Sequence, residues 1–424
     1  MNLKDLHPSL RIRVGVGFVN RLVDSMITSF MAIHLALTFG VAAAGGLLIA
    51  VIALGVVGML VGGHVADLHG RRRTLLVAEA AAAVTFALMA VAEGAGDGAV
   101  DSSLLVYLGY LANKFAASVA LPANDAMIVD LSTPEIRKGV YTVNFWATNL
   151  ALAIGALLGA ALYSAHFALV LGLAAAATAG VLATTYFLIA ETKPDTDTDR
   201  VRPPGVAAAL REFGAGYRLV LRDKVFLKLM IAGTLTLAVE FQLVNHIAVR
   251  LAAGFPSQAL LPVGWSPVVD GVGMLGVLRA ENTILVVVLA LFSTTLLRRV
   301  SDRTGLYLGT ALFVGGYAVL AVSGTGWLLM VAGLVFTIGE LMSVPVKQAL
   351  LANLVPDHSR TRYMAVYNLN IRVAQGLAAA CVTLGAVVPA WGMAALYLAL
   401  GAVIIAQYRS VLAAQSAPAP LARA

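Results

Sequence analysis

The stretch Gly62-Gly63-His64-Val65-Ala66-Asp67-Leu68-His69-Gly70-Arg71-Arg72-Arg73-Thr74 lies between two apolar runs that are each long enough to span a bilayer. Glycine adopts positive φ without steric cost, so the glycines on either side of Asp67 allow the backbone to turn tightly. The acid and the arginines mark where the chain meets water on one side of a membrane. In the simpler interpretation, the arginines only anchor a short cytoplasmic loop.

The composition indicates an integral membrane protein. Of its 424 residues, 60% are hydrophobic and 12% are charged, whereas soluble domains have about 25% charged residues. The mean hydropathy is +0.88. The single cysteine, Cys381, excludes an intrachain disulfide and a Cys-x-x-Cys site. Because there is no Walker motif, nucleotide-binding glycine loop or metal-ligand spacing, we expect no enzyme activity, no cofactor and no metal.

Apolar segments recur along the whole chain at the length that a membrane-spanning helix needs, which is about 20 residues. Helices satisfy every backbone amide internally, as hydrocarbon demands. We therefore predict an all-α integral membrane protein with twelve transmembrane helices, at about 12–37, 41–66, 72–92, 104–131, 139–163, 165–189, 225–252, 280–300, 304–322, 326–353, 362–388 and 390–410.

Lysines and arginines gather in alternate loops, and this sets the predicted orientation. They precede the first segment, follow segments 2, 4, 8 and 10, and close the last one, while Arg250 and Arg279 bracket the long loop between segments 7 and 8. By the positive-inside rule, both termini are cytoplasmic in a multi-pass plasma-membrane protein. The net charge of +7 is therefore an orientation signal and predicts no nucleic-acid partner.

A proline-rich and charged stretch divides the chain into halves of six segments. We predict an N-terminal six-helix bundle at 1–190, a cytoplasmic linker at 191–224, and a C-terminal six-helix bundle with a cytoplasmic tail at 225–424. Residues 210–222 are expected to form an amphipathic helix on anionic lipid. The halves also repeat, because 65–70 aligns with 300–305 and 122–131 aligns with 345–354.

The spacing Gly-x-x-x-Asp-x-x-Gly-Arg-Arg resembles the loop between helices 2 and 3 of the major facilitator superfamily. Over about residues 10–410 the chain is similar to its drug:proton antiporters of the LmrP multidrug-exporter type. The resemblance implies two six-helix bundles with a substrate site between them. It also implies a conformational latch, formed by Gly63, Asp67, Gly70, Arg71, Arg72 and Asp130.

Two features depart from that antiporter pattern. The helix 5 signature joins glycines to a proline, but Gly155 and Gly159 stand here without the proline, so helix packing explains them equally well. Asn144 also stands where these exporters carry an acid. Both differences weigh against proton antiport of many different substrates.

Five ionisable residues fall near the middle of the predicted spans: Asp24, Lys114, Glu240, Glu340 and Arg372. Such residues usually face a cavity and mark a transport path, and the resemblance implies that helices 1, 4, 7 and 10 line that cavity. The alternative is a set of structural ion pairs. With three acids against two bases, the set mildly favours cationic substrates.

A carboxylate that is buried without a close cation takes up a proton readily, which suits it to proton coupling. We predict Glu340 as the principal proton-binding acid, then Glu240, with Arg372 shared between them. Asp24 is the third candidate for proton coupling, and it pairs with Lys114 near Arg21. Glu79 is expected to be structural. The candidates for contact with an amphiphilic substrate are Asn144, Phe145, Trp146, Asn149, Phe241 and Tyr367.

The predicted function is proton-coupled export of amphiphilic, cationic or zwitterionic drugs, hence multidrug efflux and antibiotic resistance. The expected partners are a small-molecule substrate, protons and the lipid bilayer, and the protein is expected to be a monomer. A proton symporter that takes up a nutrient or peptide is the first alternative, because the same fold serves both directions. A receptor or scaffold that does not transport is the second.

Overall fold

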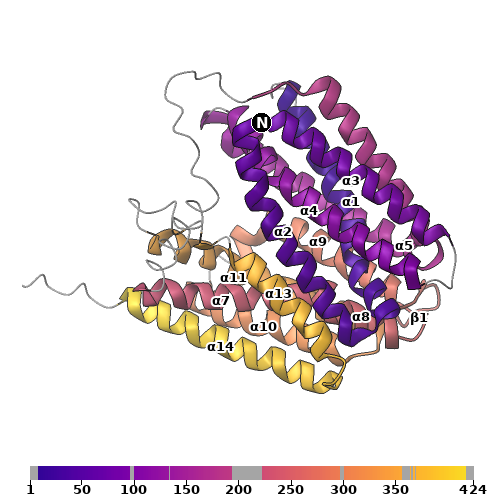
Figure 1. Cartoon of the computed structure of the whole chain (residues 1–424). Helices are drawn as coiled ribbons and strands as arrows, with labels where there is room; N and C mark the ends of the chain where they lie inside the picture. The colour runs from indigo at the N-terminus through magenta and orange to yellow at the C-terminus, as the bar shows by residue number, and fades with distance from the viewer. Residues whose placement is uncertain are drawn as a thin grey trace, which may run out of the picture. The chain divides into compact units, whose positions relative to one another are not determined.

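A computed structural model of the chain is almost entirely helical (Figure 1). Within the residues described, eleven segments are long and apolar enough to cross a membrane, and the apolar helix Leu369–Leu384 is shorter. The predicted all-α fold of twelve membrane helices is therefore confirmed. The structure describes residues 8–95, 100–132, 134–192, 222–296, 300–355, 363, 366–367 and 369–416, so the predicted helix at 210–222 lies outside it except for its last residue.

Two compact units make up the chain. Unit 1 comprises Met1–Ala209 with Gly271–Thr283, and unit 2 comprises Leu210–Asp270 with Ile284–Ala424. The predicted boundaries around the linker at 191–224 stay a prediction. The sequence did not indicate that residues 271–283, which belong to the second half of the chain, pack with the first.

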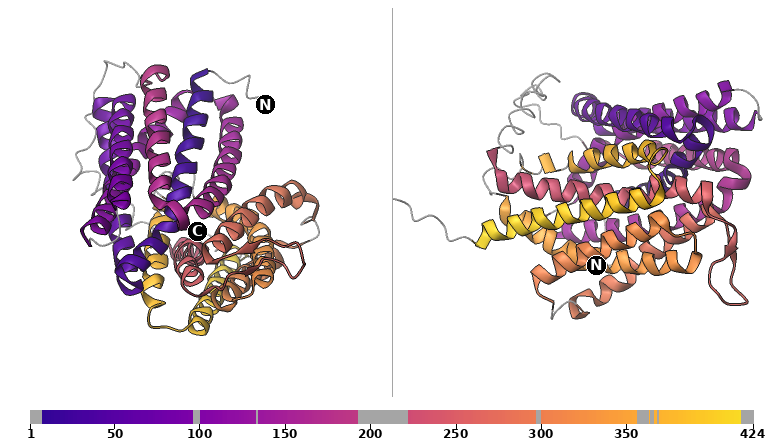
Figure 2. Two further views of the ribbon diagram at one scale, coloured as in Figure 1. Left: turned by 90° about the vertical axis from the view of Figure 1, so that its right-hand side faces the viewer. Right: turned by 90° about the horizontal axis from the view of Figure 1, so that it is seen from below.

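Unit 1 is built on long helices that run side by side (Figure 2). Helix α5 covers two predicted segments and is interrupted at His166, whose φ of −151° and ψ of 57° are not helical. Within the unit, α1 packs mainly on α5, α2 on α4, and α3 on both α4 and α5. The helices are α1 (Pro8–Phe39), α2 (Val41–His69), α3 (Arg71–Gly94), α4 (Val100–Asp130) and α5 (Pro134–Leu188).

Unit 2 packs α10 between α11 and α14, and α7 against α13 and α14. A short antiparallel hairpin pairs Gln258 with Val269 ahead of α9. Helix α9 starts nine residues earlier than the sequence predicted. Arg279 therefore lies inside the helix, and the prediction that it borders the loop was wrong. The elements are α7 (Lys224–Glu240), η2 (Phe241–Val244), α8 (His246–Gly254), β1 (Gln258–Ala259), β2 (Val268–Val269), α9 (Gly271–Leu296), α10 (Asp302–Val322), α11 (Gly326–Leu354), α13 (Leu369–Leu384) and α14 (Ala390–Ser416).

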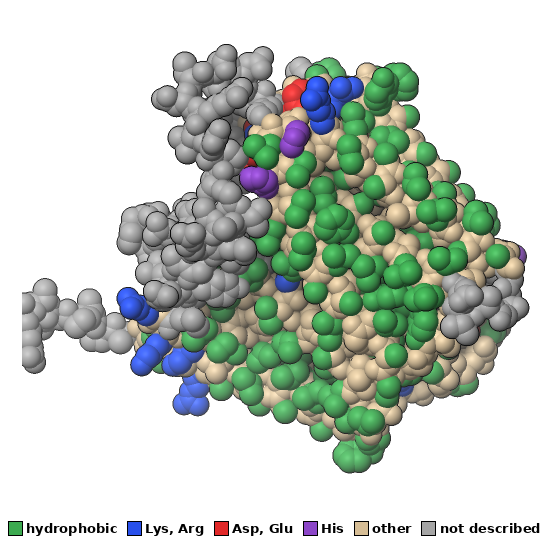
Figure 3. Space-filling model, in the orientation of Figure 1, with side chains coloured by type: hydrophobic (Ala, Val, Ile, Leu, Met, Phe, Trp, Pro, Cys, Tyr) green, Lys and Arg blue, Asp and Glu red, His purple; other side chains and the backbone are tan. Residues whose placement is uncertain are grey.

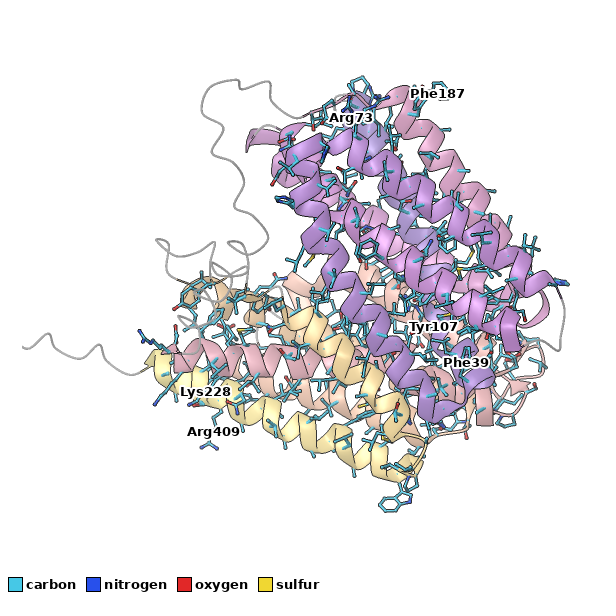
Figure 4. The ribbon with its side chains drawn as sticks, viewed as in Figure 1. Phe39, Arg73, Tyr107, Phe187, Lys228 and Arg409 are labelled. Carbon is cyan, nitrogen blue, oxygen red and sulfur yellow. The ribbon has the colours of Figure 1, made fainter. Side chains whose placement is uncertain are left out.

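The outer faces of the helices are apolar, as contact with lipid requires. On α3, Val77, Leu88 and Val91 are among the exposed hydrophobic side chains, and Figure 3 shows hydrophobic side chains spread over one face of the molecule. Figure 4 places Arg73, at the start of α3, at one end of unit 1 and Phe39, at the end of α1, at the other.

Small residues let α1 and α5 approach closely. A Cβ atom on Gly159 would lie 2.4 Å from Cε2 of Phe30 and 2.5 Å from the carbonyl oxygen of Met26, and a Cβ on Gly155 would lie 2.4 Å from the carbonyl oxygen of Leu22. In lipid, helix association depends on such close packing, because the surrounding hydrocarbon provides no hydrophobic driving force. The glycine pair in α5 therefore has a structural role in holding α1.

We predict that Gly159→Ala destabilises unit 1, because the added methyl group meets the backbone of α1. Overpacking of this kind costs about 1–3 kcal/mol. The measurement is the melting temperature of the detergent-purified protein, followed by intrinsic fluorescence. Gly180→Ala in the same helix is the matched control, since no heavy atom lies within 4 Å of its Cβ position. Equal melting temperatures for the two variants would contradict the predicted role of Gly159.

Candidate functional site

Unit 1 holds a charge cluster between α1 and α4. The ammonium group of Lys114 forms an ion pair with Asp24 and donates a hydrogen bond to the Thr28 hydroxyl at 2.6 Å. The same ammonium group lies 5.4 Å from the ring centroid of Tyr110. Helix spacing explains the geometry, because Asp24 and Thr28 are one turn apart and share a face of α1. The structure thus brings together the predicted pair of Asp24 and Lys114.

Arg279 adds a second cation to this cluster. Its guanidinium donates to the Ser25 hydroxyl at 3.4 Å and interacts electrostatically with Asp24. The close approach of α9 to α5 brings it there, because a Cβ on Gly276 would lie 2.4 Å from that of Ala160. The predicted neighbour Arg21 interacts instead with Asp125.

Unit 2 holds a second cluster, which we call the acid pair: Glu240 at the end of α7 and Glu340 in the middle of α11. The two carboxylates interact electrostatically with each other and with Lys347. Lys347 lies two turns after Glu340 on α11 and faces the Phe313 ring at 5.9 Å. The acid pair and Lys347 together carry a net charge of −1 when both carboxylates are ionised.

The helix that carries Glu240 breaks immediately after it. Residues 241–244 form a 3₁₀ turn, and Asn245 has φ −117° and ψ −104° before α8 begins. Side chains satisfy the freed carbonyl groups: the Tyr317 hydroxyl donates to Glu240 O at 3.0 Å and the Asn245 amide donates to Phe241 O at 2.8 Å. The predicted continuous helix at 225–252 is therefore interrupted at the acid pair, and irregular backbone at this depth needs such partners.

The other predicted residues lie in separate places. Arg372, predicted to share the acids, donates to the Gln375 side chain at 3.3 Å within α13, and Lys347 interacts with both acids. Phe241 lies in the 3₁₀ turn, and Tyr367 packs against the cluster around Phe226 and Tyr363. Asn144, Trp146 and Asn149 lie on α5, and the side chain of Phe145 is outside the described residues.

The latch loop between α2 and α3 forms specific contacts. Arg71 forms an ion pair with Asp130 at the end of α4, with 3.1 Å between Nη1 and Oδ2. The Glu191 carboxylate accepts hydrogen bonds from the backbone N–H groups of Arg71 and Arg72, each at 3.1 Å. An acid at this position satisfies amide groups at the start of α3 that no intrahelical carbonyl can reach.

Gly70 makes this capping contact possible. Its φ is +96°, in the region that favours glycine. A Cβ atom on Gly70 would also lie 2.5 Å from the Glu191 carboxylate. The glycine of the motif is therefore required both by the backbone conformation and by the carboxylate beside it.

Several residues of these sites were missed by reasoning from the sequence. Glu191 follows the last apolar residue of a segment, where it gave no signal beyond the start of a polar linker. Arg279 was assigned to a loop because the start of its helix was placed too late. Lys347 was not among the predicted site residues, although its spacing of two turns from Glu340 places both on one face of α11.

Neither charge cluster resembles a metal centre. Among the described residues, no group of three or more His, Cys, Asp or Glu side chains is arranged to hold a metal ion.

Comparison with known proteins identifies the family and several similar transporters. The family model described as "Major Facilitator Superfamily" matches residues 14–379. A "Na(+), Li(+), K(+)/H(+) antiporter" of Planococcus maritimus is 31% identical over 386 residues, which cover 89% of each chain. The "Multidrug resistance protein MdtH" of Escherichia coli O9:H4 (strain HS) is 26% identical over 322 residues, covering 74% of this chain and 69% of the relative.

Solved structures support the same architecture. A peptide transporter POT in complex with sulfate superposes with a TM-score of 0.68 at 16% identity, covering 95% of this chain and 94% of the other. The nucleoside transporter NupG gives a TM-score of 0.67 at 12% identity, with 97% and 100% covered. At these identities the likeness establishes the fold alone.

We predict that Gly70→Ala destabilises the start of α3 because alanine cannot adopt the local backbone conformation without strain. Strain of this kind costs about 1–3 kcal/mol, and the methyl group also displaces Glu191. The melting temperature of the purified protein should fall, whereas Gly63→Ala should leave it nearly unchanged, since its Cβ would meet only the Pro122 Cβ at 3.9 Å. If Gly70→Ala melts like the unmodified protein, Gly70 has no special role in the cap.

Proposed function

This chain belongs to the major facilitator superfamily, and we propose that it is a proton-coupled antiporter that expels cationic substrates from the cell. The observation that carries the proposal is the acid pair of Glu240 and Glu340 with Lys347, which lies where the α-helix is interrupted after α7. Ionisable residues at membrane depth are expensive and mark transport paths and proton relays.

The charge of this cluster supplies a mechanism of exchange. With both acids ionised, the cluster is at −1, and either one proton or one monovalent cation neutralises it. Binding both would leave a net positive charge in a region of low dielectric constant, which is strongly unfavourable. Proton and substrate cation therefore compete for the same site, and competition at one site that opens to each side in turn produces antiport.

This mechanism exchanges one proton for one monovalent cation, so it moves no net charge across the membrane. Glu340 is the principal proton-binding acid in the proposal, and Glu240 is the second. Glu340 lies in the middle of α11, while Glu240 borders the irregular backbone. Carbonyl groups of unwound helices are known ligands for cations in transporters.

The relatives support two classes of cation. The Planococcus maritimus relative, which is similar over most of its length, is named for exchange of Na⁺, Li⁺ and K⁺ for protons. The MdtH relatives are named for multidrug resistance, which fits the predicted export of amphiphilic organic cations in the manner of LmrP-type exporters. We propose alkali cations as the first substrate class and organic cations as the second.

The other sites have supporting roles in this proposal. The ion pair of Arg71 and Asp130 holds α3 to α4 as part of the latch that stabilises the outward-open state, with Asp67 as a further member. The cluster of Asp24, Lys114 and Arg279 carries a net charge of +1 and stays ionised through the cycle. Uptake by symport, the alternative, requires proton and substrate to bind together, which the net charge of the acid pair disfavours.

The proposal is tested in everted membrane vesicles that contain the protein and have been acidified inside. We expect that adding Na⁺, K⁺ or Li⁺ outside releases protons from the lumen, seen as recovery of acridine orange fluorescence, and that ethidium is accumulated more weakly. Because the exchange is electroneutral, collapsing the membrane potential should not change its rate. Vesicles without the protein are the control, and a rate that depends on the membrane potential would contradict one-for-one exchange.

We predict that Glu340→Gln abolishes proton-driven exchange and also strongly slows the exchange of Na⁺ for ²²Na⁺. Glutamine mimics the protonated acid and cannot release a proton, so the cluster stays neutral and a bound cation would leave it with a net positive charge. Both activities are measured in one preparation of proteoliposomes. Proton-driven exchange at the unmodified rate would pass the role to Glu240 or Asp24. Exchange of Na⁺ for ²²Na⁺ at the unmodified rate would show that proton and cation do not compete through Glu340. Glu340→Asp keeps a titratable charge and should retain both activities in part, so their complete loss in this variant would make Glu340 a structural residue.

A further inference from the structure

A third group of charges lies at the latch end of unit 1 and takes no part in the proposed exchange. Its centre is Arg13, near the start of α1, which is only 1% exposed. Its guanidinium donates one hydrogen bond to the Asn124 side chain of α4 and interacts electrostatically with Glu79 of α3 and Asp125 of α4. A buried guanidinium is costly unless its charge and its donors are compensated.

The charge of Arg13 is compensated by nearby acids, but its hydrogen-bond donors are not all satisfied. Nε and Nη1 of Arg13 are buried without a hydrogen-bond partner, and so is Oε2 of Glu79. Glu79 is only 5% exposed. The Thr185 hydroxyl of α5 interacts with this carboxylate, but it is buried and forms no hydrogen bond of normal geometry. Arg13 and Glu79 thus attract each other electrostatically, and each keeps buried polar atoms without a hydrogen bond.

This arrangement fits a water-bridged pair of charges. A buried water molecule typically makes about three hydrogen bonds to polar groups that would otherwise be unsatisfied. The donors of Arg13, the Glu79 carboxylate and the Thr185 hydroxyl supply that number of partners from three helices. A charge pair that is separated by water is held more weakly than a direct ion pair, so either partner can change its state.

We propose that Glu79 is a second proton-binding site, separate from the acid pair of unit 2, which exchanges its proton with cytoplasmic water by way of Asp125, while Arg13 stays charged beside both acids. The binding step is simple: a proton from water adds to the Glu79 carboxylate and leaves by the same route. The exposed side chain of Asp125, which also interacts with Arg21, connects the buried group to solvent.

The protonation state of Glu79 decides which acids attract Arg13. When Glu79 is ionised, Arg13 is attracted to both Glu79 and Asp125, and when Glu79 is neutral, Asp125 holds Arg13 alone. Because Arg13 is on α1, Glu79 on α3 and Asp125 on α4, protonation shifts the attraction of α1 from α3 towards α4. The groups that face Glu79 and Arg13 are Asn124 and Asp125 from α4, Thr185 from α5 and, through Asp125, Arg21 from α1.

The position of the site indicates its use. Glu79 lies eight residues after Arg71 in α3 and Asp125 lies five residues before Asp130 in α4, so the site is close to the latch ion pair. Protonation at this end therefore reports cytoplasmic pH to the helices that the latch joins. This consequence rests on the proposed antiport, whereas proton binding at Glu79 does not.

Proton binding is tested directly on the full-length purified protein by infrared difference spectroscopy between mildly alkaline and mildly acidic buffer. We expect acidification to produce the carbonyl stretching band of a protonated carboxylic acid, and Glu79→Gln to remove one carboxyl's share of it. Asp302→Asn removes an exposed carboxyl from α10 and should leave the band from the buried acid intact. An unchanged band in Glu79→Gln overturns the proposal, because Glu79 then stays ionised.

If Glu79→Gln does not fold, Glu79→Asp decides the question, since it keeps an acid but moves it by one methylene. A shifted band or midpoint supports the site, and an unaltered spectrum overturns it. In everted vesicles the cytoplasmic face is outside, so Glu79→Gln should also flatten the dependence of Na⁺/H⁺ exchange on external pH, relative to Asp302→Asn. If the unmodified protein shows no Na⁺/H⁺ exchange, the antiport proposal is refuted. The infrared result then still shows whether Glu79 binds a proton.

Discussion

Hydrocarbon offers no partner to a charge or to an unpaired backbone amide, and this constraint governs where every charged residue of the chain lies. Several of the charges in the described membrane-spanning helices gather in clusters. Lys114 has Asp24 and a hydroxyl group, and the acids of unit 2 have Lys347. Each cluster joins helices that are distant in sequence, so the same contacts that lower the cost of burial also connect the parts that must move together.

The clusters differ in how completely their charges are matched, and that difference separates structure from chemistry. A direct ion pair such as that of Lys114 and Asp24 has little reason to take up or lose a proton. Two acids that share one lysine hold an excess negative charge, which a proton or a cation relieves. At the latch end of unit 1, Arg13 and Glu79 are balanced in charge but not in hydrogen bonds.

Much of the architecture was predictable because hydrophobic length and the distribution of arginines are properties of the sequence alone. Most of the membrane helices were predicted within a few residues, and the family resemblance of the latch loop led to its pairing with α4. Asp24, Lys114, Glu240 and Glu340 were identified because ionisable residues stand out in apolar segments. Their partners were harder to predict. Which cation meets which acid depends on helix rotation, and the position of Arg279 depends on a helix start that no glycine or proline pattern fixed.

The break after Glu240 shows why local sequence was insufficient. The residues Phe241-Gln242-Leu243-Val244-Asn245 contain neither glycine nor proline, which are the usual signals for a break in a membrane helix. Here the helix is opened by side chains that replace its own amides: Asn245 and Gln242 bond to carbonyls of the preceding turn, and Tyr317 reaches across from α10. Only the tertiary structure brings Tyr317 to that point. Departures from local rules tend to concentrate at functional sites, and this departure directly adjoins one of the two acids to which we assign proton exchange.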